Sequence, residues 1–507
     1  MFRDPILAAF DELHAHQPER ALVASSSRLA TVADVHRQAA ELADRLHEHA
    51  LVPGRLVGLV APNGPGFLVG YLAMRRCGLV PVLCDVAVPP HALEEILARF
   101  DVAGCLSLSD PWPRGGRHWT FVTRLGAVLR HLSEAVGAVK LTSGSTGAPR
   151  GVVVSSAALV ADEMQLAATM GLSAEDRHLG AIPFSHSYGF SSVVMPALLR
   201  GALVIVPDER SAMAPLVAAR DLGATFFPAV PAWLSGWTRL ASPLPLPPSV
   251  RLLTSAGAPL AAETARAVRE RFGLAVKVFY GASECGGIAF DREGTAAERG
   301  TVGSPVEGVS IELDAETGRL RVRSAALADG YLPEPAPELS GGSFLTGDLA
   351  AWEEARSGEL RLLGRADDLI IVKGKNVQPR EVEIVLRDLP GVEEACVLGM
   401  DGPEGQRTVL RAVLAAGASS ALTFESVVEH CRGRLAEHKI PRSIVVLPEL
   451  PRDGRGKFDR RRLADPALAT GSSLAPGDSL ATGESNTRFE TASAASLVAL
   501  PSARPAS

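Results

Sequence analysis

Short apolar runs alternate with amphipathic stretches through most of the chain. The apolar runs are rich in Val, Leu and Ile, end in small or turn-forming residues, and occupy 55–62, 79–85, 202–207, 225–230, 250–257 and 276–281. Stretches with apolar residues at helical spacing lie between them at 67–78, 215–223 and 263–273. Strands that alternate with crossover helices build mostly parallel sheets. We therefore predict an α/β fold in which helices flank mostly parallel sheets.

The pattern changes at about Thr301. Shorter alternating runs at 309–313, 318–324 and 358–364 predict antiparallel strands, which form a β subdomain on one side. Beyond this point the predicted order is strand, helix, strand, strand, helix, strand, at 370–374, 379–389, 393–400, 408–416, 425–438 and 443–450. We expect a large N-terminal domain at 1–364 and a small, mobile α+β domain at 365–464.

The last part of the chain has a different composition. Residues 465–507 are rich in Ala, Ser, Thr, Gly and Pro and contain almost no large apolar residues. Such a segment cannot bury enough surface to offset its ordering entropy. We predict a disordered tail.

Charge and cysteine content narrow the class of protein. Lys and Arg number 51 against 57 Asp and Glu, so the net charge of −6 gives no bulk attraction to nucleic acid or to an anionic membrane. An anionic ligand must therefore be held by a local site. The six cysteines form no C-x-x-C pair, which argues against a disulfide framework or a zinc site. With neither a signal-peptide pattern nor an apolar run of about 20 residues, we expect a cytoplasmic protein without a membrane span.

A Ser/Thr/Gly loop between two predicted strands is the strongest local signal. It lies in AVKLTSGSTGAPRGVVVS, from Ala138 to Ser155. Glycines let backbone N–H groups approach an oxyanion closely and the hydroxyls add donors, so the loop is a candidate phosphate cradle. Gly144 and Gly147 are too close together for a Walker A loop, which also requires G-K-[ST]. An ordinary Gly/Ser hairpin turn is the alternative.

Two carboxylates and one lysine further along the chain are candidate nucleotide-binding or catalytic residues. Asp348, at the end of a strand in FLTGDL, could accept hydrogen bonds from the two hydroxyls of a ribose. Glu284, in FYGASECGG, could help to hold magnesium among phosphates. Either could instead be a turn acid. Lys457 follows a flexible stretch in LPRDGRGKFDRRRL, where a solvated basic loop is the alternative to a mobile catalytic cation.

Taken in order, these motifs resemble those of the adenylate-forming superfamily, which includes acyl-CoA synthetases, luciferases and peptide-synthetase adenylation domains. The resemblance spans about residues 20–463. It rests on LTSGSTGAPRGV, PFSHSYGF, LLTSAGAPL, YGASE, TGDL, GRADDLIIVKGKNVQPREVE and LPRDGRGKFDRRRL.

The resemblance implies a two-step ligase that uses ATP and Mg²⁺. A carboxylate attacks the α-phosphate of ATP and releases pyrophosphate, and a thiol then converts the acyl-adenylate to a thioester and AMP. The thiol is that of CoA, or the phosphopantetheine of an acyl carrier protein, and no residue distinguishes the two. A catalytically silent nucleotide-binding regulator is a further alternative, and the retained Lys457, Asp348, Arg365 and Glu284 argue against it.

The resemblance also implies residue roles. Lys457 stabilises charge on the carboxylate and α-phosphate, and Asp348 holds the ribose with the help of Arg365. Ser283 contacts the α-phosphate, while Glu284 and Thr146 organise magnesium. The phosphate loop consists of Thr142, Ser143, Gly144, Ser145, Thr146 and Gly147, followed by Arg150. The adenine side consists of Ala256, Gly257, Ala258, Pro259, Tyr280, Gly281 and Ala282. Lys373, Gly374 and Lys375 line the entry of the thiol, and Asp367 is the hinge about which the small domain turns.

The sequence departs from the family pattern at several positions. Arg150 replaces a usual lysine, Ser145 and Ser283 replace common threonines, and Ala256 replaces a frequent glycine. His186 stands where amino-acid-activating domains usually carry an aspartate, which argues against an α-amino acid substrate. Phe184, Phe190, Phe227, Trp233, Gly286 and Gly287 would suit a fatty acyl or aryl acid, although core packing is the simpler explanation of most aromatic residues.

Overall fold

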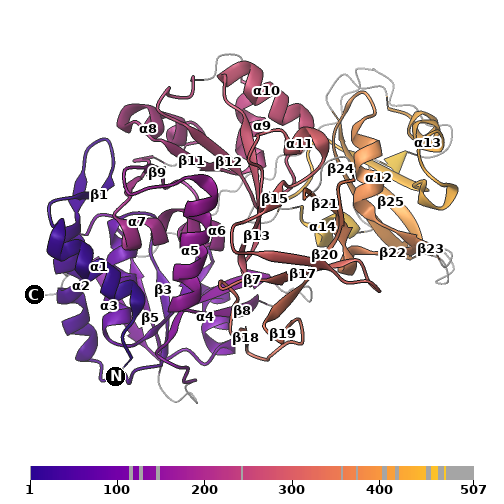
Figure 1. Cartoon of the computed structure of the whole chain (residues 1–507). Coiled ribbons are helices and arrows are strands. Elements are labelled where there is room, and N and C mark those ends of the chain that lie inside the picture. The colour runs from indigo at the N-terminus through magenta and orange to yellow at the C-terminus, as the bar shows by residue number, and fades with distance from the viewer. Residues whose placement is uncertain are drawn as a thin grey trace, which may run out of the picture. The chain divides into compact units, whose positions relative to one another are not determined.

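The computed structural model (Figure 1) describes residues 2–113, 118–124, 130–143, 149–209, 211–240, 244–354, 358–372, 375–401, 408–416, 422–452, 458–465 and 473–474. The chain forms two compact units. The first comprises 1–370 with 378–381 and 452–458, and the second comprises 371–377, 382–451 and 459–507. The predicted domain limits stay predictions.

The first sheet of the larger unit has the strand order β18-β8-β7-β4-β3-β5-β6. Its strands are β3 (Leu56–Val60), β4 (Val80–Cys84), β5 (Gly104–Leu108), β6 (Trp119–Thr123), β7 (Val136–Ser143), β8 (Pro149–Ser155) and β18 (Gly330–Leu332). The four central strands are parallel, as predicted, and the edge pairs are antiparallel. Parallel sheets need cover on both faces, which explains why β4 is buried along its whole length.

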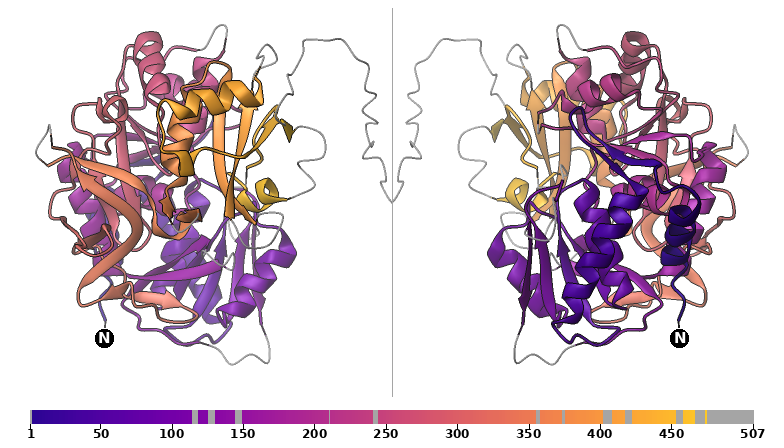
Figure 2. Two further views of the ribbon diagram at one scale, coloured as in Figure 1. Left: turned by 90° about the vertical axis from the view of Figure 1, so that its right-hand side faces the viewer. Right: turned by 90° about the vertical axis from the view of Figure 1, so that its left-hand side faces the viewer.

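The N-terminal part of the chain also forms α1 (Pro5–His16), α2 (Val32–His47), α3 (Pro65–Arg76) and α4 (Pro90–Arg99). Of these, α3 packs on this sheet against β3, β4 and β5, and α2 packs on α3. The right-hand view of Figure 2 shows the indigo helices of the N-terminus side by side. The predicted helix at 67–78 is α3, and it is buried all round from Pro65 to Arg75. Its one buried cation is satisfied because Arg75 Nε donates to Asp4 Oδ2 at 2.7 Å.

The second sheet has the order β15-β14-β13-β12-β11-β9-β10-β1-β2. Its strands are β1 (Ala21–Ala24), β2 (Leu29–Thr31), β9 (Arg177–Leu179), β10 (Leu203–Ile205), β11 (Phe226–Ala229), β12 (Leu252–Ser255), β13 (Val276–Ala282), β14 (Gly286–Phe290) and β15 (Ser304–Pro305). The run from β13 to β1 is parallel, and the strands beyond it at each end are antiparallel. The strands β10, β11, β12 and β13 coincide with predicted apolar runs, and the parallel order confirms the α/β fold class.

The helices near the second sheet include α5 (Ser156–Met170), α7 (Met195–Arg200), α8 (Ala214–Leu222), α9 (Pro231–Thr238) and α10 (Ala262–Phe272), with the short α6 (Ser187–Gly189), η2 (Phe190–Val194) and α11 (Ala296–Arg299). Of these, α5, α7, α8, α10 and α11 each end at a glycine in the left-handed conformation. Gly223 follows α8 at φ 65° and Gly273 follows α10 at φ 70°. Only glycine adopts this conformation at little cost, so each residue stops its helix and directs the chain into the next strand.

An antiparallel sheet completes the larger unit, as the alternating runs predicted. It contains β16 (Ser310–Leu313), β17 (Arg319–Arg323), β19 (Leu339–Ser340), β20 (Ser343–Trp352) and β21 (Leu360–Arg365), which is followed by η3 (Ala366–Asp368). In the β20–β21 pair Asp348 lies directly opposite Arg365. Residues paired in this way have neighbouring side chains, so the register itself brings the two charges together.

The smaller unit is built on the sheet β24-β25-β26-β27. Its elements are β23 (Lys375–Val377), β24 (Val392–Asp401), β25 (Thr408–Ala416), α13 (Phe424–Arg432), η4 (Glu437–Lys439), β26 (Ser443–Leu447), α14 (Arg460–Ala464) and β27 (Ser473–Leu474). Two further elements, β22 (Ile370–Val372) and α12 (Pro379–Arg387), begin in the larger unit and continue into this one. Glu383 of α12 accepts a hydrogen bond from the backbone of Val397 in β24 at 3.0 Å.

One part of the predicted tail differs from the prediction. Ser473 and Leu474 form β27 and pair with Val445 and Ile444 of β26. A free sheet edge offers unpaired backbone groups to any extended segment, which accounts for a strand in a sequence with little apolar content. The other tail residues beyond Asp465 lie outside the described residues. No described helix is both long enough and apolar enough to span a membrane.

A buried carboxylate joins three neighbouring strands of the second sheet. Asp176 accepts hydrogen bonds from Arg251 Nη2 at 2.6 Å, from Thr225 Oγ1 at 2.7 Å and from the Ser173 backbone at 2.8 Å. Burial alone would raise the pKa of Asp176, but these hydrogen bonds outweigh it and lower the pKa to about 2. The carboxylate therefore stabilises the folded state when it is ionised.

Asp176→Asn is expected to lower the free energy of unfolding by about 2 kcal/mol at neutral pH. A depressed carboxyl pKa stabilises the protein above the unfolded value, so the deficit should shrink as the pH falls from about 4 towards 2. Urea unfolding followed by tryptophan fluorescence tests this, because all five tryptophans lie in the larger unit. The exposed Asp221, paired with Arg220, supplies the control Asp221→Asn, and equal deficits in the two variants would refute the role.

Candidate active site

The predicted phosphate loop joins the two strands of an antiparallel pair. Thr142, near the end of β7, lies opposite Arg150 at the start of β8, and Thr142 Oγ1 donates to the Arg150 carbonyl at 3.5 Å. Ser143 is the last residue of β7. The loop residues Gly144, Ser145, Thr146 and Gly147 lie outside the described residues. The structure thus supplies the two ends of the loop.

The carboxyl ends of adjacent parallel strands bring the predicted adenine-side residues together. Ser255 of β12 pairs with Val278 of β13, so the segments that follow these positions leave the same edge of the sheet. These segments hold Ala256, Gly257, Ala258, Pro259, Tyr280, Gly281 and Ala282. Gly257 has φ +85°, a conformation that suits glycine, and a side chain added there would meet open space. Ligands of open α/β sheets bind at this edge.

Asp348 is the centre of a small polar cluster. Tyr280 Oη donates to Asp348 Oδ2 at 2.5 Å, and Arg365 Nη1 lies 3.5 Å from Asp348 Oδ1. The Asp348 backbone N–H donates to the buried Thr346 Oγ1 at 3.1 Å. Burial, followed by the charge of Asp348, raises the pKa of Tyr280, so the phenol stays a proton donor. The carboxylate is held in place and keeps acceptor capacity for a diol.

Glu284 lies in the turn between β13 and β14 and is partly buried. Tyr331 Oη donates to Glu284 Oε1 at 3.1 Å, and the guanidinium carbon of Arg150 lies 3.9 Å from the centre of the Tyr331 ring. Burial raises the pKa of Glu284, although hydrogen bonds and the nearby arginines oppose that shift. Beside it, the hydroxyls of Ser283 and Ser187 are 2.6 Å apart.

His186, in the aromatic motif, pairs with a carboxylate from the other large sheet. His186 Nε2 lies 2.7 Å from Oδ2 of Asp85, which follows the end of β4. Two residues on, Tyr188 Oη lies 2.8 Å from Thr254 Oγ1 of β12. The motif is therefore fixed by polar contacts on both sides.

Three of the aromatic residues expected to line an acid pocket are core residues instead. Phe184, Phe190 and Phe227 have no exposed surface. Phe184 and Phe190 both pack against Phe67, and Phe227 packs edge-on against Trp237. Trp233 is partly buried and also contacts Trp237. This agrees with the simpler explanation of core packing, since periodicity shows that a residue is buried but not whether it faces a cavity.

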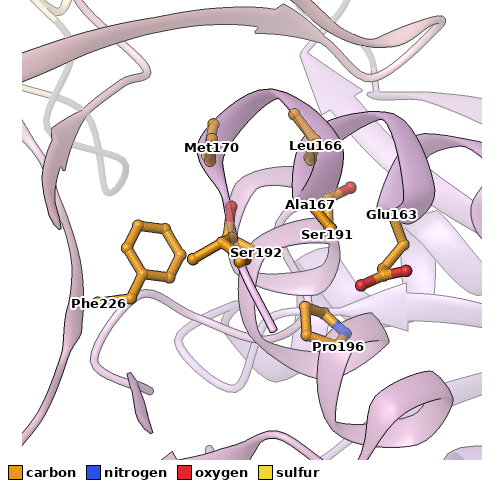
Figure 3. A pocket seen from close by; sticks show the side chains of 9 residues that line it. Glu163, Leu166, Ala167, Met170, Ser191, Ser192, Pro196 and Phe226 are labelled. Atoms are coloured by element: carbon orange, nitrogen blue, oxygen red, sulfur yellow. The ribbon is translucent and has the colours of Figure 1, made fainter. Parts of the chain in front are cut away.

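A small pocket lies elsewhere, between α5 and η2 (Figure 3). It is lined by Glu163, Leu166, Ala167, Met170, Leu172, Ser191, Ser192, Pro196 and Phe226. Its one carboxylate is already paired, because Arg200 Nε lies 2.5 Å from Glu163 Oε1 and Arg200 Nη2 lies 3.0 Å from Oε2. The pocket contains no residue that the sequence assigned to the site.

Other predicted site residues lie outside the described residues. They are Lys373, Gly374 and Lys457, and the side chain of Asp367 is likewise not described. Their roles stay predictions.

The site also contains residues that sequence reasoning missed. Tyr331, Ser187 and Asp85 contact Glu284, Ser283 and His186, respectively. Asp85 could have been found, because it is the last residue of a predicted parallel strand, at the edge where ligands bind. Ser187 lies in the motif PFSHSYGF, but its partner Ser283 is distant in sequence, and Tyr331 lies in none of the quoted motifs.

Comparison with known proteins gives the family. A model described as AMP-binding enzyme matches residues 10–125 and 131–332, and one described as AMP-binding enzyme C-terminal domain matches 381–457. The chain is 31% identical over 476 residues to the 2-succinylbenzoate–CoA ligase of Bacillus licheniformis, covering 88% of this chain and 97% of that protein. It is 28% identical over 480 residues to a feruloyl-CoA synthase of Amycolatopsis, covering 87% and 94%.

A solved structure shares the fold. O-succinylbenzoate coenzyme A synthetase from Bacillus subtilis, in complex with AMP, superposes with a TM-score of 0.77 at 24% identity, covering 90% of this chain and 98% of that one. The family models and the relative at 31% identity settle the classification. The chain belongs to the AMP-binding enzyme family, the adenylate-forming superfamily that its motifs resemble.

Proposed function

We propose that the protein joins a carboxylic acid, fatty acyl or aryl, to the thiol of CoA at the expense of ATP, through an acyl-adenylate. The polar cluster at Asp348 is the observation that carries the proposal. A carboxylate held by Tyr280 and flanked by Arg365 at a ligand-binding sheet edge suits the hydroxyls of a ribose. The two relatives named above, a 2-succinylbenzoate–CoA ligase and a feruloyl-CoA synthase, support the same reaction class.

The donor set at Glu284 fits a divalent cation held with phosphates. The group is an oxygen ligand beside the hydroxyls of Ser283 and Ser187, and magnesium prefers oxygen donors. With Thr146 of the phosphate loop, Glu284 would hold the ion, which supplies positive charge to neutralise the triphosphate. The chain itself then has to position two anions for reaction.

The residues divide this work. Asp348 and Tyr280 hold the nucleoside, so that the α-phosphate is fixed relative to Ser283. Lys457 stabilises the charge that develops when the carboxylate attacks the α-phosphate and pyrophosphate leaves. In the second step the thiol attacks the acyl carbon, forming the thioester bond and releasing AMP.

The acid itself is assigned by class. His186 stands where an aspartate would pair with the ammonium of an amino acid, so an α-amino acid is disfavoured. The pairing of His186 with Asp85 places a polar group near the aromatic motif, which suits the carboxylate end of the acid rather than its apolar part.

Pyrophosphate release tests the proposal. The protein, ATP and Mg²⁺ are incubated with a panel of fatty, aryl and amino acids, each with and without CoA. Release with one acid class, accelerated by CoA and accompanied by its thioester, is the expected result. Release that CoA leaves unchanged would point to a carrier-protein acceptor instead, and no release with any acid would favour the silent nucleotide-binding regulator.

A further inference from the structure

Arg150 and Tyr331 form a clamp beside Glu284 that the motifs did not reveal. Tyr331 is at the centre of the short strand β18, which pairs with β8 next to the phosphate loop, and Tyr331 lies opposite Val152. Arg150, two residues earlier on β8, stacks on its ring at 3.9 Å. The ring is 7% exposed, so it is fixed in place by packing as well as by the arginine.

The free end of this tyrosine reaches the Glu284 carboxylate. Tyr331 Oη donates to Glu284 Oε1 at 3.1 Å, which leaves Oε2 for another partner. The Glu284 backbone is also held, because its carbonyl accepts from the N–H of Ala328 at 2.8 Å, on the segment that leads into β18. One strand thus fixes both the main chain and the side chain of Glu284.

The clamp also explains why arginine can replace the usual lysine. A guanidinium is planar and stacks on an aromatic face, whereas an ammonium is a point charge without a stacking surface. At this position the planar group covers the Tyr331 ring, and its positive charge lies on the same side of the site as Glu284.

We propose that Tyr331 is a positioning residue that orients Glu284 towards the magnesium ion of the bound nucleotide, and that Arg150 acts through Tyr331 by stacking on its ring. The inference rests on the proposed function, since it assigns a task to the same site. It predicts that loss of the Tyr331 hydroxyl raises the Mg²⁺ concentration needed for ATP binding. Turnover at saturating Mg²⁺ should change less.

Tyr331→Phe removes the hydroxyl and keeps the ring. We expect the Mg²⁺ concentration that gives half-maximal ATP binding to rise about tenfold, because a hydrogen bond to a charged group is lost. Isothermal titration calorimetry with ATP measures this without any acid substrate. In the full reaction, kcat should recover at saturating Mg²⁺, whereas a variant with a disturbed fold would not recover. Arg150→Lys keeps the charge but loses the stack, and should raise the same concentration roughly threefold.

A double-mutant cycle separates positioning from packing. In the Glu284→Gln background, Tyr331→Phe should raise the half-maximal Mg²⁺ concentration little further, because the carboxylate that Tyr331 orients is gone. Tyr71→Phe is the matched control, since this buried tyrosine also donates one hydrogen bond, to the Gly137 carbonyl at 3.2 Å, away from the site. It should leave the Mg²⁺ dependence unchanged.

The outcomes distinguish a failure of the proposed function from a failure of the role assigned to Tyr331. If the wild-type protein binds no ATP at any Mg²⁺ concentration, the proposed function fails. If the wild type binds ATP and Tyr331→Phe shows the same Mg²⁺ dependence, or loses equally in both backgrounds, the clamp has no positioning role and the inference is overturned.

Discussion

Lys457→Ala is expected to slow acyl-adenylate formation by about 10²- to 10³-fold, the usual cost of removing one group that stabilises transition-state charge. Thioester formation from a supplied acyl-adenylate should be largely unaffected. The reason is that the lysine neutralises the meeting of two anions, a problem that exists only in the first step. In the second step a thiol attacks a carbonyl carbon. One residue can therefore matter in one half-reaction alone.

Measuring the two half-reactions separately tests this expectation. Single-turnover pyrophosphate release reports the first step, and thioester formation from synthetic acyl-adenylate and CoA reports the second. Lys439→Ala, which removes another lysine of the C-terminal region, is the control and should be near wild type in both. Equal losses in both half-reactions of Lys457→Ala would contradict the assigned role.

Asp348→Ala should give the second-largest effect, a rise of about 30-fold in KM for ATP. Two hydrogen bonds from the ribose to the carboxylate are lost, and a net contribution of about 1 kcal/mol each amounts to about 30-fold. The side chains of Tyr280 and Arg365 would also lose their common partner. Initial rates at varied ATP, with the acid saturating, measure the effect.

One nucleotide analogue and one control variant make the result specific. The wild type should bind 2′-deoxy-ATP more weakly than ATP. In Asp348→Ala the difference between the two nucleotides should be much smaller, because the carboxylate that contacts the 2′-hydroxyl is missing. Asp314→Ala, at a turn of the same antiparallel sheet, removes a carboxylate that accepts from Thr317 and should leave KM unchanged. An unaltered KM for ATP in Asp348→Ala would show that Asp348 does not bind the ribose.

Much of the fold could be predicted because the signal is local. Apolar runs such as 79–85 and 276–281 are buried along β4 and much of β13, and alternation at 318–324 marks β17, whose Leu320 and Val322 face the core. A strand buried on one face has alternating apolar residues, and a strand buried on both faces has a continuous apolar run, so the sequence indicates either kind directly. The strand at Ser473 and Leu474 left none, because it depends on the free edge of β26.

The site could be predicted less completely, for a related reason. Asp348 and Glu284 lie in recognisable motifs, and the structure gives each a defined set of polar partners. The sequence predicted only some of those partners, because others are distant in the chain. Tyr331, for example, lies 47 residues beyond Glu284. Phe184 and Phe227, which the sequence offered as either pocket or core residues, pack into the core. Whether an aromatic residue lines a cavity depends on its neighbours in space.

Oxygen tracing tests the central claim most directly. The acid is labelled with ¹⁸O in its carboxylate, and the AMP formed with ATP, Mg²⁺ and CoA is analysed by mass spectrometry. Attack of the carboxylate on the α-phosphate leaves one acid oxygen bridging carbon and phosphorus, and it stays with phosphorus when the thiol takes the acyl group. The account predicts one ¹⁸O in AMP. Unlabelled AMP, or ADP with label in inorganic phosphate, would contradict an acyl-adenylate.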